Sequence, residues 1–321
     1  MRLLTAMGMF REMERGSYVS TPLGAAFVSD SPLSSIVTHG YVSCICQRPS
    51  KPNISNKLAR TYVASIFSQL PEYLKRNGWK SPDDAHDGPF QYAIGSKCHY
   101  FDFLAAQPHY QEAFNTVMKM PERRRGEDWF DFFPVEEKLS VLQPSDVLLV
   151  DIGGNQGRDI AEFTRKYPGI RGKLVLEDLP AVVDGASNLP PNVQVQGYSF
   201  FDEQPVKGAK AYYLRTVLHD WPDKQARQLL ARIQEAMAPD SLLLVNEILL
   251  PESNVALSSS YTDWTMMAMF ASLERTKRQF ERLLEEAGFE LVNVWMPKGL
   301  GENSAALADQ AALLEARLKR T

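Results

Sequence analysis

The stretch Val147-Leu-Leu-Val-Asp-Ile-Gly-Gly-Asn-Gln-Gly-Arg-Asp159 runs from an apolar segment through a glycine-rich loop into a helical pattern. Gly153 and Gly154 permit a tight turn after a strand, and Gly157 lets the next helix approach the sheet closely. The backbone of such a turn can come near a nucleotide-like ligand at the helix N-terminus. Alone, the loop is equally compatible with a purely structural turn. Its glycine spacing also differs from the dinucleotide pattern G-x-G-x-x-G, which disfavours a NAD-dependent dehydrogenase.

Apolar runs alternate with helical patterns from about residue 136 onward, whereas the residues before it are mainly helical. This alternation predicts an α/β domain with a mostly parallel sheet covered on both faces. The carboxyl ends of parallel strands meet at one edge, where an open sheet binds its ligand. We therefore expect two domains, residues 1–135 and 136–321. The predicted strands are 147–152, 173–176, 193–197, 211–218, 242–248 and 289–295.

The first domain begins with the pieces of a winged-helix unit, which are a helix, a small hairpin and a helix opened by Thr21-Pro22. Few basic residues accompany these pieces, so DNA binding is disfavoured. Further helices are expected from Ser55 to about Ser68, from Pro71 to a stop at Gly78, and over 110–120. At the other end of the chain, residues 303–321 are alanine-rich and helical in pattern.

Composition excludes several classes of protein. The 321 residues are 44% hydrophobic and 23% charged, as in a soluble globular chain. The net charge of −4 gives no general attraction to nucleic acids or anionic membranes. No apolar run reaches the roughly 20 residues that span a membrane. Three cysteines support neither a disulfide framework nor a four-ligand zinc site, so we expect no metal and a cytoplasmic location.

Acidic residues flank the glycine loop in the predicted sheet. Asp151 precedes the loop, and Glu177-Asp178 follows the second strand, about twenty residues after Gly157. A carboxylate at the end of the second strand can accept hydrogen bonds from both hydroxyls of a ribose. These acids would repel a pyrophosphate, so they favour S-adenosylmethionine as the ligand. A helix cap is the alternative interpretation of Asp178 taken alone.

A histidine and two glutamates are expected near the same sheet edge. His219 follows the strand predicted over 211–218, Glu247 lies near the end of the next strand, and Glu274 precedes a helix opened by the capping box Thr276–Gln279. Each of the three has a structural explanation when it is considered alone. Together they suggest proton abstraction, because a neutral histidine with a pKa of about 6.5 can take a phenol proton and carboxylates can hold its ring.

Four motifs stand out along the chain: Val-Asp-Ile-Gly-Gly at 150–154, Glu-Asp-Leu-Pro at 177–180, Tyr-Tyr-Leu-Arg-Thr-Val-Leu-His-Asp-Trp-Pro-Asp at 212–223 and Leu-Glu-Arg-Thr at 273–276. Through these motifs the chain resembles the S-adenosylmethionine-dependent O-methyltransferases of plant and fungal small-molecule metabolism. The resemblance spans roughly residues 1–296 and is most specific over 147–290. It implies that His219 is the general base, with Glu247 and Glu274 flanking it.

The resemblance also implies the residues that bind cofactor and substrate. S-adenosylmethionine is expected to contact Gly153, Gly154, Asp178, Ser199, Phe200 and Arg215. A small aromatic or polyketide-like acceptor is expected to contact Asp220, Trp264, Met267 and Phe270. The chain departs from the family at Asn155, where a third loop glycine is usual, and at Ser199, where an aspartate is usual. Both departures predict weaker cofactor binding.

Members of this family pair through amino-terminal helices, so the resemblance implies a homodimer. The sequence begins at Met1 inside the winged-helix pattern, which leads us to expect a weakened dimer. Two other functions stay open at this point. The chain could keep the cofactor fold and catalyse a non-methylating reaction, such as a dehydration or a pericyclic rearrangement, or it could be an inactive shortened product.

Overall fold

The computed structural model describes residues 1–14, 16–25, 64–108, 110–111, 114, 127–141, 143–297 and 311–320. The chain divides into two compact units. The first comprises Met1–Arg124 and Leu250–Glu274, and the second comprises Arg125–Leu249 and Arg275–Thr321. This division differs from the expected boundary at residue 135. The reason is packing, because Trp129 lies in the core of the second unit and Phe270 lies in the core of the first.

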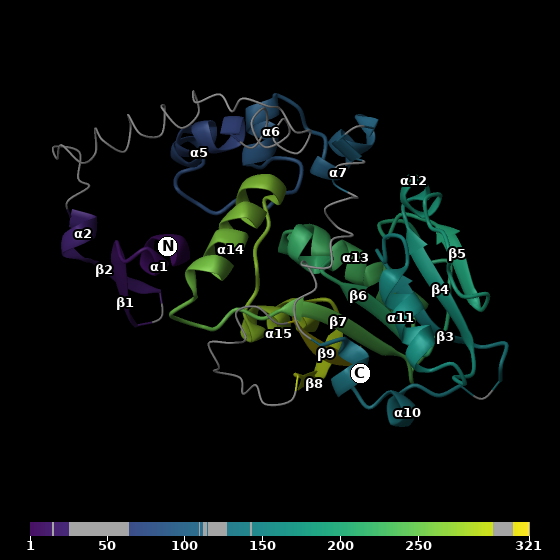
Figure 1. Ribbon diagram of the computed structural model, residues 1–321. Coiled ribbons are helices and arrows are strands. Elements are labelled where there is room, and N and C mark those ends of the chain that lie inside the picture. The colour runs from purple at the N-terminus through teal and green to yellow at the C-terminus, as the bar shows by residue number, and fades with distance from the viewer. Residues whose placement is uncertain are drawn as a thin grey trace. The chain divides into compact units, whose positions relative to one another are not determined.

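The second unit is built on a seven-stranded sheet in the order β5-β4-β3-β6-β7-β9-β8 (Figure 1). Strands β3 to β7 are parallel, so the predicted mostly parallel α/β sheet is confirmed. Because β3 lies between β4 and β6, the chain changes direction across the sheet at β3, which is where an open sheet binds its ligand. The strands are β3 Val147–Ile152, β4 Lys173–Asp178, β5 Val193–Gly197, β6 Ala211–Arg215, β7 Leu242–Ile248, β8 Phe289–Trp295 and β9 Ala311–Leu318.

Helices pack on this sheet and on one another. Helix α15 contacts β8 and α13, and α12 contacts β4 and β5. The predicted capping box is present at the start of α15, where Thr276 Oγ1 accepts the N–H of Gln279 and Gln279 Oε1 accepts the N–H of Thr276. The helices of this unit are α9 Trp129–Phe132, α10 Val135–Lys138, α11 Arg158–Lys166, α12 Pro180–Val183, α13 Asp223–Ala236 and α15 Lys277–Glu286, with a 3-10 turn at Leu218–Asp220.

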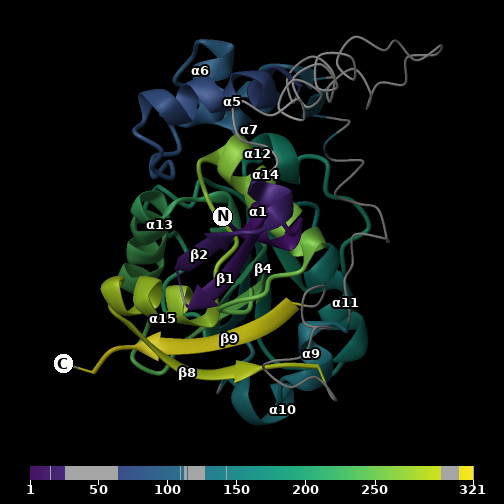
Figure 2. The ribbon, with the colours of Figure 1, turned by 90° about the vertical axis from the view of Figure 1, so that its left-hand side faces the viewer.

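The end of the chain corrects one prediction. The alanine-rich segment forms strand β9, antiparallel to β7 and β8, and no helix occurs in its described part, Ala311–Leu318 (Figure 2). Alanine, leucine and glutamate favour helices as isolated residues. Here the segment lies between two strands, and residues 312–316 are all buried. Burial on both faces removes the alternation that usually identifies a strand, and tertiary pairing overrides the helical propensity.

The strand expected over 211–218 is shorter than predicted. Strand β6 ends at Arg215, and Thr216 adopts a left-handed backbone with φ of +48°. The N–H of Thr216 donates to Asn246 O at 3.1 Å, after which the chain enters the 3-10 turn. Val217 and Leu218 are buried although they lie outside the strand, which explains why the apolar run extends past its end.

Within its described residues, the first unit contains helices and one hairpin. The N–H of Gly24 donates to Thr21 Oγ1 at 3.1 Å, so Thr21 caps the helix that it was predicted to open. The expected helix, hairpin and helix at the start of the chain are present (Figure 1), and their assignment to a winged-helix unit stays a prediction. The elements are α1 Arg2–Ala6, β1 Phe10–Glu14, β2 Ser17–Ser20, α2 Pro22–Ala25, α5 Ala64–Arg76, α6 Pro89–Ile94, α7 Tyr100–Ala105 and α14 Leu257–Phe270.

Helix α5 corrects a second prediction, because it continues through Pro71 where a new helix was expected to start. A proline inside a helix removes one backbone hydrogen bond. Ile66, Leu70 and Tyr73 are all buried at helical spacing, so one continuous apolar face holds the helix together across the proline. Gly78, with φ of +64°, ends the helical conformation after α5, as predicted. The part of the expected helix 55–68 that precedes residue 64, and most of the helix expected over 110–120, lie outside the described residues.

Within the described residues, no helix has the length and apolar character needed to cross a membrane.

Candidate active site

The glycine loop after β3 has a backbone that side chains would obstruct. A Cβ on Gly154 would lie 2.5 Å from Leu176 Cδ1 and 2.6 Å from the carboxylate of Asp151. Gly153 has φ of +70°, and Asn155 has φ of +55°. Asparagine tolerates this conformation better than most residues, so the departure from a third glycine leaves a left-handed backbone at residue 155. The loop therefore presents bare backbone at the carboxyl end of β3.

Asp178 joins this loop to the end of β4. Its Oδ2 accepts the N–H of Asn155 at 2.8 Å, and its Oδ1 accepts the N–H of Leu179 at 2.7 Å. Burial raises the pKa of the Asp178 carboxyl, and these two backbone donors act in the opposite direction. Each carboxylate oxygen has a further lone pair, so Asp178 can still accept hydrogen bonds from a ligand.

Asp151 is buried directly beneath the loop, with 1% of its surface exposed. Its Oδ2 has no hydrogen-bond partner among the described residues. Burial, and then the nearby Asp159, raise the pKa of the Asp151 carboxyl well above its usual value. A buried acceptor without a donor fits a ligand that brings a cation or an N–H group. The bare loop, Asp178 and Asp151 together fit S-adenosylmethionine, which carries a ribose and positive charge.

Two more predicted cofactor residues follow β5. The ring of Phe200 packs against Trp221 with centroids 5.7 Å apart, and its Cε1 would lie 3.9 Å from a Cβ on Gly153. Ser199 Oγ accepts the N–H of Phe201 at 3.4 Å. These positions bring the segment after β5 to the glycine loop. Contact between either residue and the cofactor stays a prediction.

Arg215, at the end of β6, forms an ion pair with Asp159 of α11. The hydroxyl of Tyr213 donates to the second oxygen of the same carboxylate at 2.9 Å. Arg215 therefore links β6 to the helix that follows the glycine loop. Its predicted contact with the cofactor stays a prediction.

His219 lies in the 3-10 turn after β6, so it is separated from the strand end by the left-handed Thr216. The imidazole is mostly buried, with 17% of its side chain exposed. Its Nε2 lies 3.5 Å from Oδ1 of Asp220, which was predicted to contact the substrate. The turn also reaches the glycine loop, because Val217 Cγ2 would lie 2.9 Å from a Cβ on Gly153.

Glu247 is fully buried on β7, next to this turn. Its Oε1 accepts the backbone N–H groups of Val217 at 3.1 Å, Leu218 at 2.9 Å and His219 at 3.4 Å. The structure thus brings Glu247 and His219 together, as the sequence predicts, and the contact runs through the backbone of the turn.

Arg275 is a residue that the sequence analysis did not single out. Its Nη1 donates to Leu218 O at 2.6 Å, and its Nη2 donates to Trp221 O at 2.8 Å. The available signal was its place in the Leu-Glu-Arg-Thr motif, directly before the cap of α15. Nothing in that motif indicates which carbonyl groups the guanidinium reaches, because they lie more than fifty residues away in the chain.

The remaining predicted residues belong to the first unit. Glu274 is 2% exposed, and its N–H donates to Asp263 Oδ1 at 2.9 Å. Trp264 stacks on Phe67 with ring centroids 4.1 Å apart. Phe270 is buried in an aromatic cluster with Tyr100, and Met267 is partly buried on the same helix, α14. The approach of Glu274, Trp264, Met267 and Phe270 to His219 stays a prediction.

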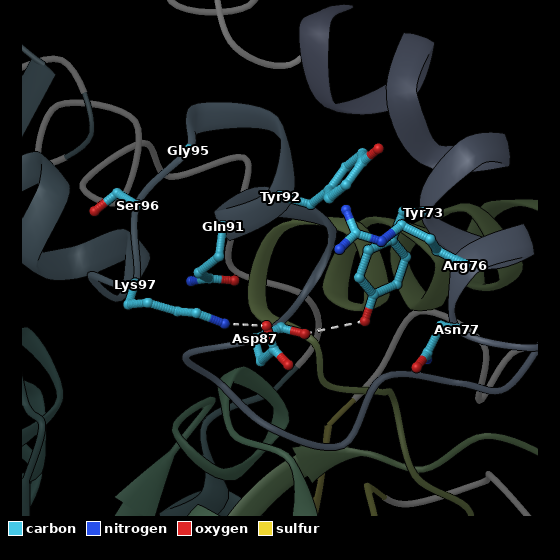
Figure 3. A pocket seen from close by; sticks show the side chains of 9 residues that line it. All are labelled: Tyr73, Arg76, Asn77, Asp87, Gln91, Tyr92, Gly95, Ser96 and Lys97. Atoms are coloured by element: carbon cyan, nitrogen blue, oxygen red, sulfur yellow. Dashed lines mark hydrogen bonds and ion pairs between the residues drawn. The ribbon is translucent and has the colours of Figure 1, made fainter.

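A cavity of about 480 Å³ lies beside α5 and α6 in the first unit (Figure 3). Lys97 and Asp87 form an ion pair at its margin, and the hydroxyl of Tyr73 donates to Asp87 O at 3.1 Å. Its described lining contains none of the residues predicted to carry chemistry. Across the described ranges, no three histidine, cysteine or acidic side chains form a group that could hold a metal ion.

The sequence of this chain matches a known protein family and several known proteins. The model of the O-methyltransferase domain matches residues 79–290, which is more than half of the chain. "O-methyltransferase mfmE" of Annulohypoxylon moriforme is 40% identical over 230 residues, or 71% of this chain and 57% of the relative. A demethylsterigmatocystin 6-O-methyltransferase of Aspergillus flavus is 29% identical over 91% of this chain and 70% of its own. The match to mfmE therefore spans little more than half of that relative's length.

Solved structures agree in fold. OxaC in complex with SAH and oxaline has a TM-score of 0.72 at 26% identity, over 97% of this chain and 72% of its own. A protein described as a pericyclic reaction enzyme has a TM-score of 0.73 at 26% identity, over 99% of this chain and 75% of its own. On the match over residues 79–290, the chain belongs to the O-methyltransferase domain family.

Proposed function

We propose that this protein is an S-adenosylmethionine-dependent O-methyltransferase that methylates a hydroxyl, preferably phenolic, of a small aromatic or polyketide-like metabolite. The observation that carries the proposal is the contact between two turns at one sheet edge. Val217, two residues before His219, lies against Gly153 of the loop that Asp178 joins to β4. A base and a cofactor cradle are therefore next to each other in one unit.

The bound cofactor supplies a methyl group that is already electrophilic. The protein then has to remove the proton of the acceptor hydroxyl and hold its oxygen in line with that methyl group. His219 takes the proton, and general-base help of this kind is worth roughly 10²- to 10⁴-fold in rate. The carboxylate of Asp220, 3.5 Å from His219 Nε2, stabilises the imidazolium that results. Glu247 fixes the direction of the ring by holding the backbone that carries it.

The relatives support this activity. The fungal protein mfmE is named an O-methyltransferase, and the Aspergillus flavus relative is named a demethylsterigmatocystin 6-O-methyltransferase. One structural neighbour is described as a pericyclic reaction enzyme, so a non-methylating reaction is the second candidate. The presence of His219 on a firmly held turn favours methyl transfer. The homodimer that the resemblance implies and the cytoplasmic location expected from the composition stay predictions.

The test is incubation with S-adenosylmethionine labelled in its methyl group and a panel of phenols and naphthols. Matched acceptors whose hydroxyl is already methylated serve as controls. We expect label to move to the free hydroxyl of at least one acceptor and to none of the controls. An acceptor that is converted without taking up label would support the non-methylating reaction. Absence of any transfer across a broad panel would contradict the proposal.

A further inference from the structure

Arg275 is a buried cation, and its side chain is 0% exposed. The guanidinium makes four hydrogen bonds: Nη1 to Leu218 O, Nη2 to Trp221 O, and Nε and Nη2 to Oδ1 of Asp223, at 2.6 to 3.1 Å. It also lies over the ring of Phe280, 5.7 Å from the centroid. A planar fork of donors in a fixed arrangement holds its partners in a fixed arrangement as well.

These hydrogen bonds hold the turn that carries His219 at carbonyl groups before and after that residue. Leu218 O precedes His219 in the chain, and Trp221 O follows it. On the donor side, Glu247 Oε1 accepts the N–H groups of residues 217–219. The turn is thus held at its N–H groups by a carboxylate and at its carbonyl groups by a guanidinium.

The turn needs such support because its entry is strained. Thr216 is β-branched and has φ of +48°, a conformation that costs such a residue about 1–3 kcal/mol. Strain of this size persists only when surrounding contacts determine the conformation. Arg275 supplies contacts of this kind from outside β6 and β7.

Stability alone does not account for a charge in this place. A buried ion pair is often no more stabilising than apolar residues of the same volume, because both charges lose their water. The guanidinium instead fixes the geometry of the turn, because its planar set of N–H donors requires two carbonyl groups and one carboxylate to lie in fixed positions. The capping box at Thr276 fixes the backbone directly after Arg275, so the Arg275 side chain extends from a backbone whose position is defined.

We propose that Arg275 is a positioning residue for His219, fixing the 218–221 turn through its carbonyl groups so that the imidazole points at the acceptor hydroxyl. The proposal rests on the proposed role of His219 as the base. Asp223 contributes to this positioning, because its Oδ1 accepts hydrogen bonds from Nε and Nη2 of Arg275 and so fixes the orientation of the guanidinium.

The test compares Arg275→Met and Arg275→Lys with the control Arg282→Met. Arg282 also pairs with Asp223, at 3.2 Å, but 63% of its side chain is exposed, and within the described part of the chain none of its hydrogen bonds reaches the turn. We expect Arg275→Met to lower kcat about 10- to 100-fold, because misplacing a reacting group by about 1 Å can cost that much. Affinity for S-adenosylhomocysteine should stay within about threefold. Arg275→Lys should be intermediate in kcat, and Arg282→Met should match the wild type within about twofold.

A second measurement does not depend on turnover. The ring signal of His219 in an NMR spectrum can be assigned by its loss in His219→Ala. We expect that signal to shift or broaden in both Arg275 variants and to stay in place in Arg282→Met. This comparison tests the positioning role even if the wild type transfers no methyl group, which would contradict the proposed function instead.

The lysine variant decides the question if Arg275→Met does not fold. An unmoved His219 signal together with wild-type kcat in a folded Arg275 variant would overturn the proposal. So would a loss of cofactor affinity as large as the loss of kcat, because that result would assign Arg275 to general stability.

Discussion

Two turns leave the same edge of the sheet, and they are held in different ways. The loop of residues 153–157 depends on small residues and backbone bonds, since the N–H groups of Gly153 and Gly154 both donate to Glu177 O. The turn of residues 216–221 depends on buried charges from Glu247 and Arg275. A loop that must admit a large ligand works by lacking side chains, whereas a turn that must aim one side chain needs partners that fix it from several directions.

The largest expected effect comes from removing the side chain that the second turn presents. His219→Ala should lower methyl transfer by roughly 10²- to 10⁴-fold, because the general base is lost. Initial rates at saturating cofactor and acceptor measure this. His86→Ala is the matched control, because His86 is exposed in the first unit. Transfer by His219→Ala at more than half the wild-type rate would show that another group removes the proton.

Adding a side chain to the first loop should have the next largest effect. In Gly154→Ala, the new Cβ would meet Leu176 Cδ1 at 2.5 Å and the Asp151 carboxylate at 2.6 Å. We expect a loss of about 1–3 kcal/mol in the free energy of unfolding, together with loss of cofactor binding. Urea unfolding measures the first and calorimetry the second.

Gly169→Ala is the control for that experiment, because nothing lies within 4 Å of a Cβ at Gly169. Equal stability and cofactor affinity in the two alanine variants would mean that the loop has room that the structure does not show.

Asp178→Asn tests the ribose contact with a smaller expected loss. Hydrogen bonds to a charged acceptor are worth about 1.5–3 kcal/mol, so removing the charge should weaken cofactor binding about 10- to 100-fold. The asparagine oxygen can still accept one backbone N–H, which keeps the loop in place. Titration with S-adenosylhomocysteine gives the affinity, and an unchanged value would exclude the ribose assignment.

The last expected effect is a pH dependence of stability, away from the methyl-transfer chemistry. Glu177 is fully buried, and its Oε2 accepts Gln204 Nε2 at 2.8 Å. Burial raises the pKa of the Glu177 carboxyl to about 7, from 4.5. The folded protein therefore binds a proton that the unfolded chain releases, so this group lowers the free energy of unfolding as pH rises from about 5 to about 8.

Glu177→Gln should remove that contribution, which is at most a few kcal/mol at about 1.4 kcal/mol per pKa unit. Urea unfolding of both proteins at pH 5.5 and pH 8 measures the difference. We expect the variant to gain stability relative to the wild type at pH 8. A wild-type pH dependence in the variant would mean that Glu177 does not titrate in this range.

Features encoded by neighbouring residues can be predicted from the sequence. The glycine loop, Asp178 and the capping box of α15 could be predicted, because each is encoded by a few neighbouring residues. His219 was identified in the same way, from its place after an apolar run. The early end of β6 at Thr216 was not predicted, since the buried Val217 continues the apolar pattern past the strand.

Features that depend on residues far apart in the sequence could not be predicted. Strand β9 has helix-forming residues and is a strand because β7 and β8 flank it. Helix α5 passes through Pro71 because its apolar face stays buried. Arg275 has a local role before the α15 cap and reaches Leu218 and Trp221 only in the folded chain. Tertiary packing decides all three, and no short segment of sequence records it.

We propose that the loop of residues 153–157 holds the cofactor and that the turn of residues 216–221 carries the base. The most direct test measures kcat and the affinity for S-adenosylhomocysteine on the same samples of His219→Ala and Asp178→Asn. We predict that His219→Ala loses kcat and keeps its affinity, whereas Asp178→Asn loses affinity and keeps most of its kcat at saturating cofactor. Parallel losses of both quantities in both variants would contradict the division of labour between the two turns.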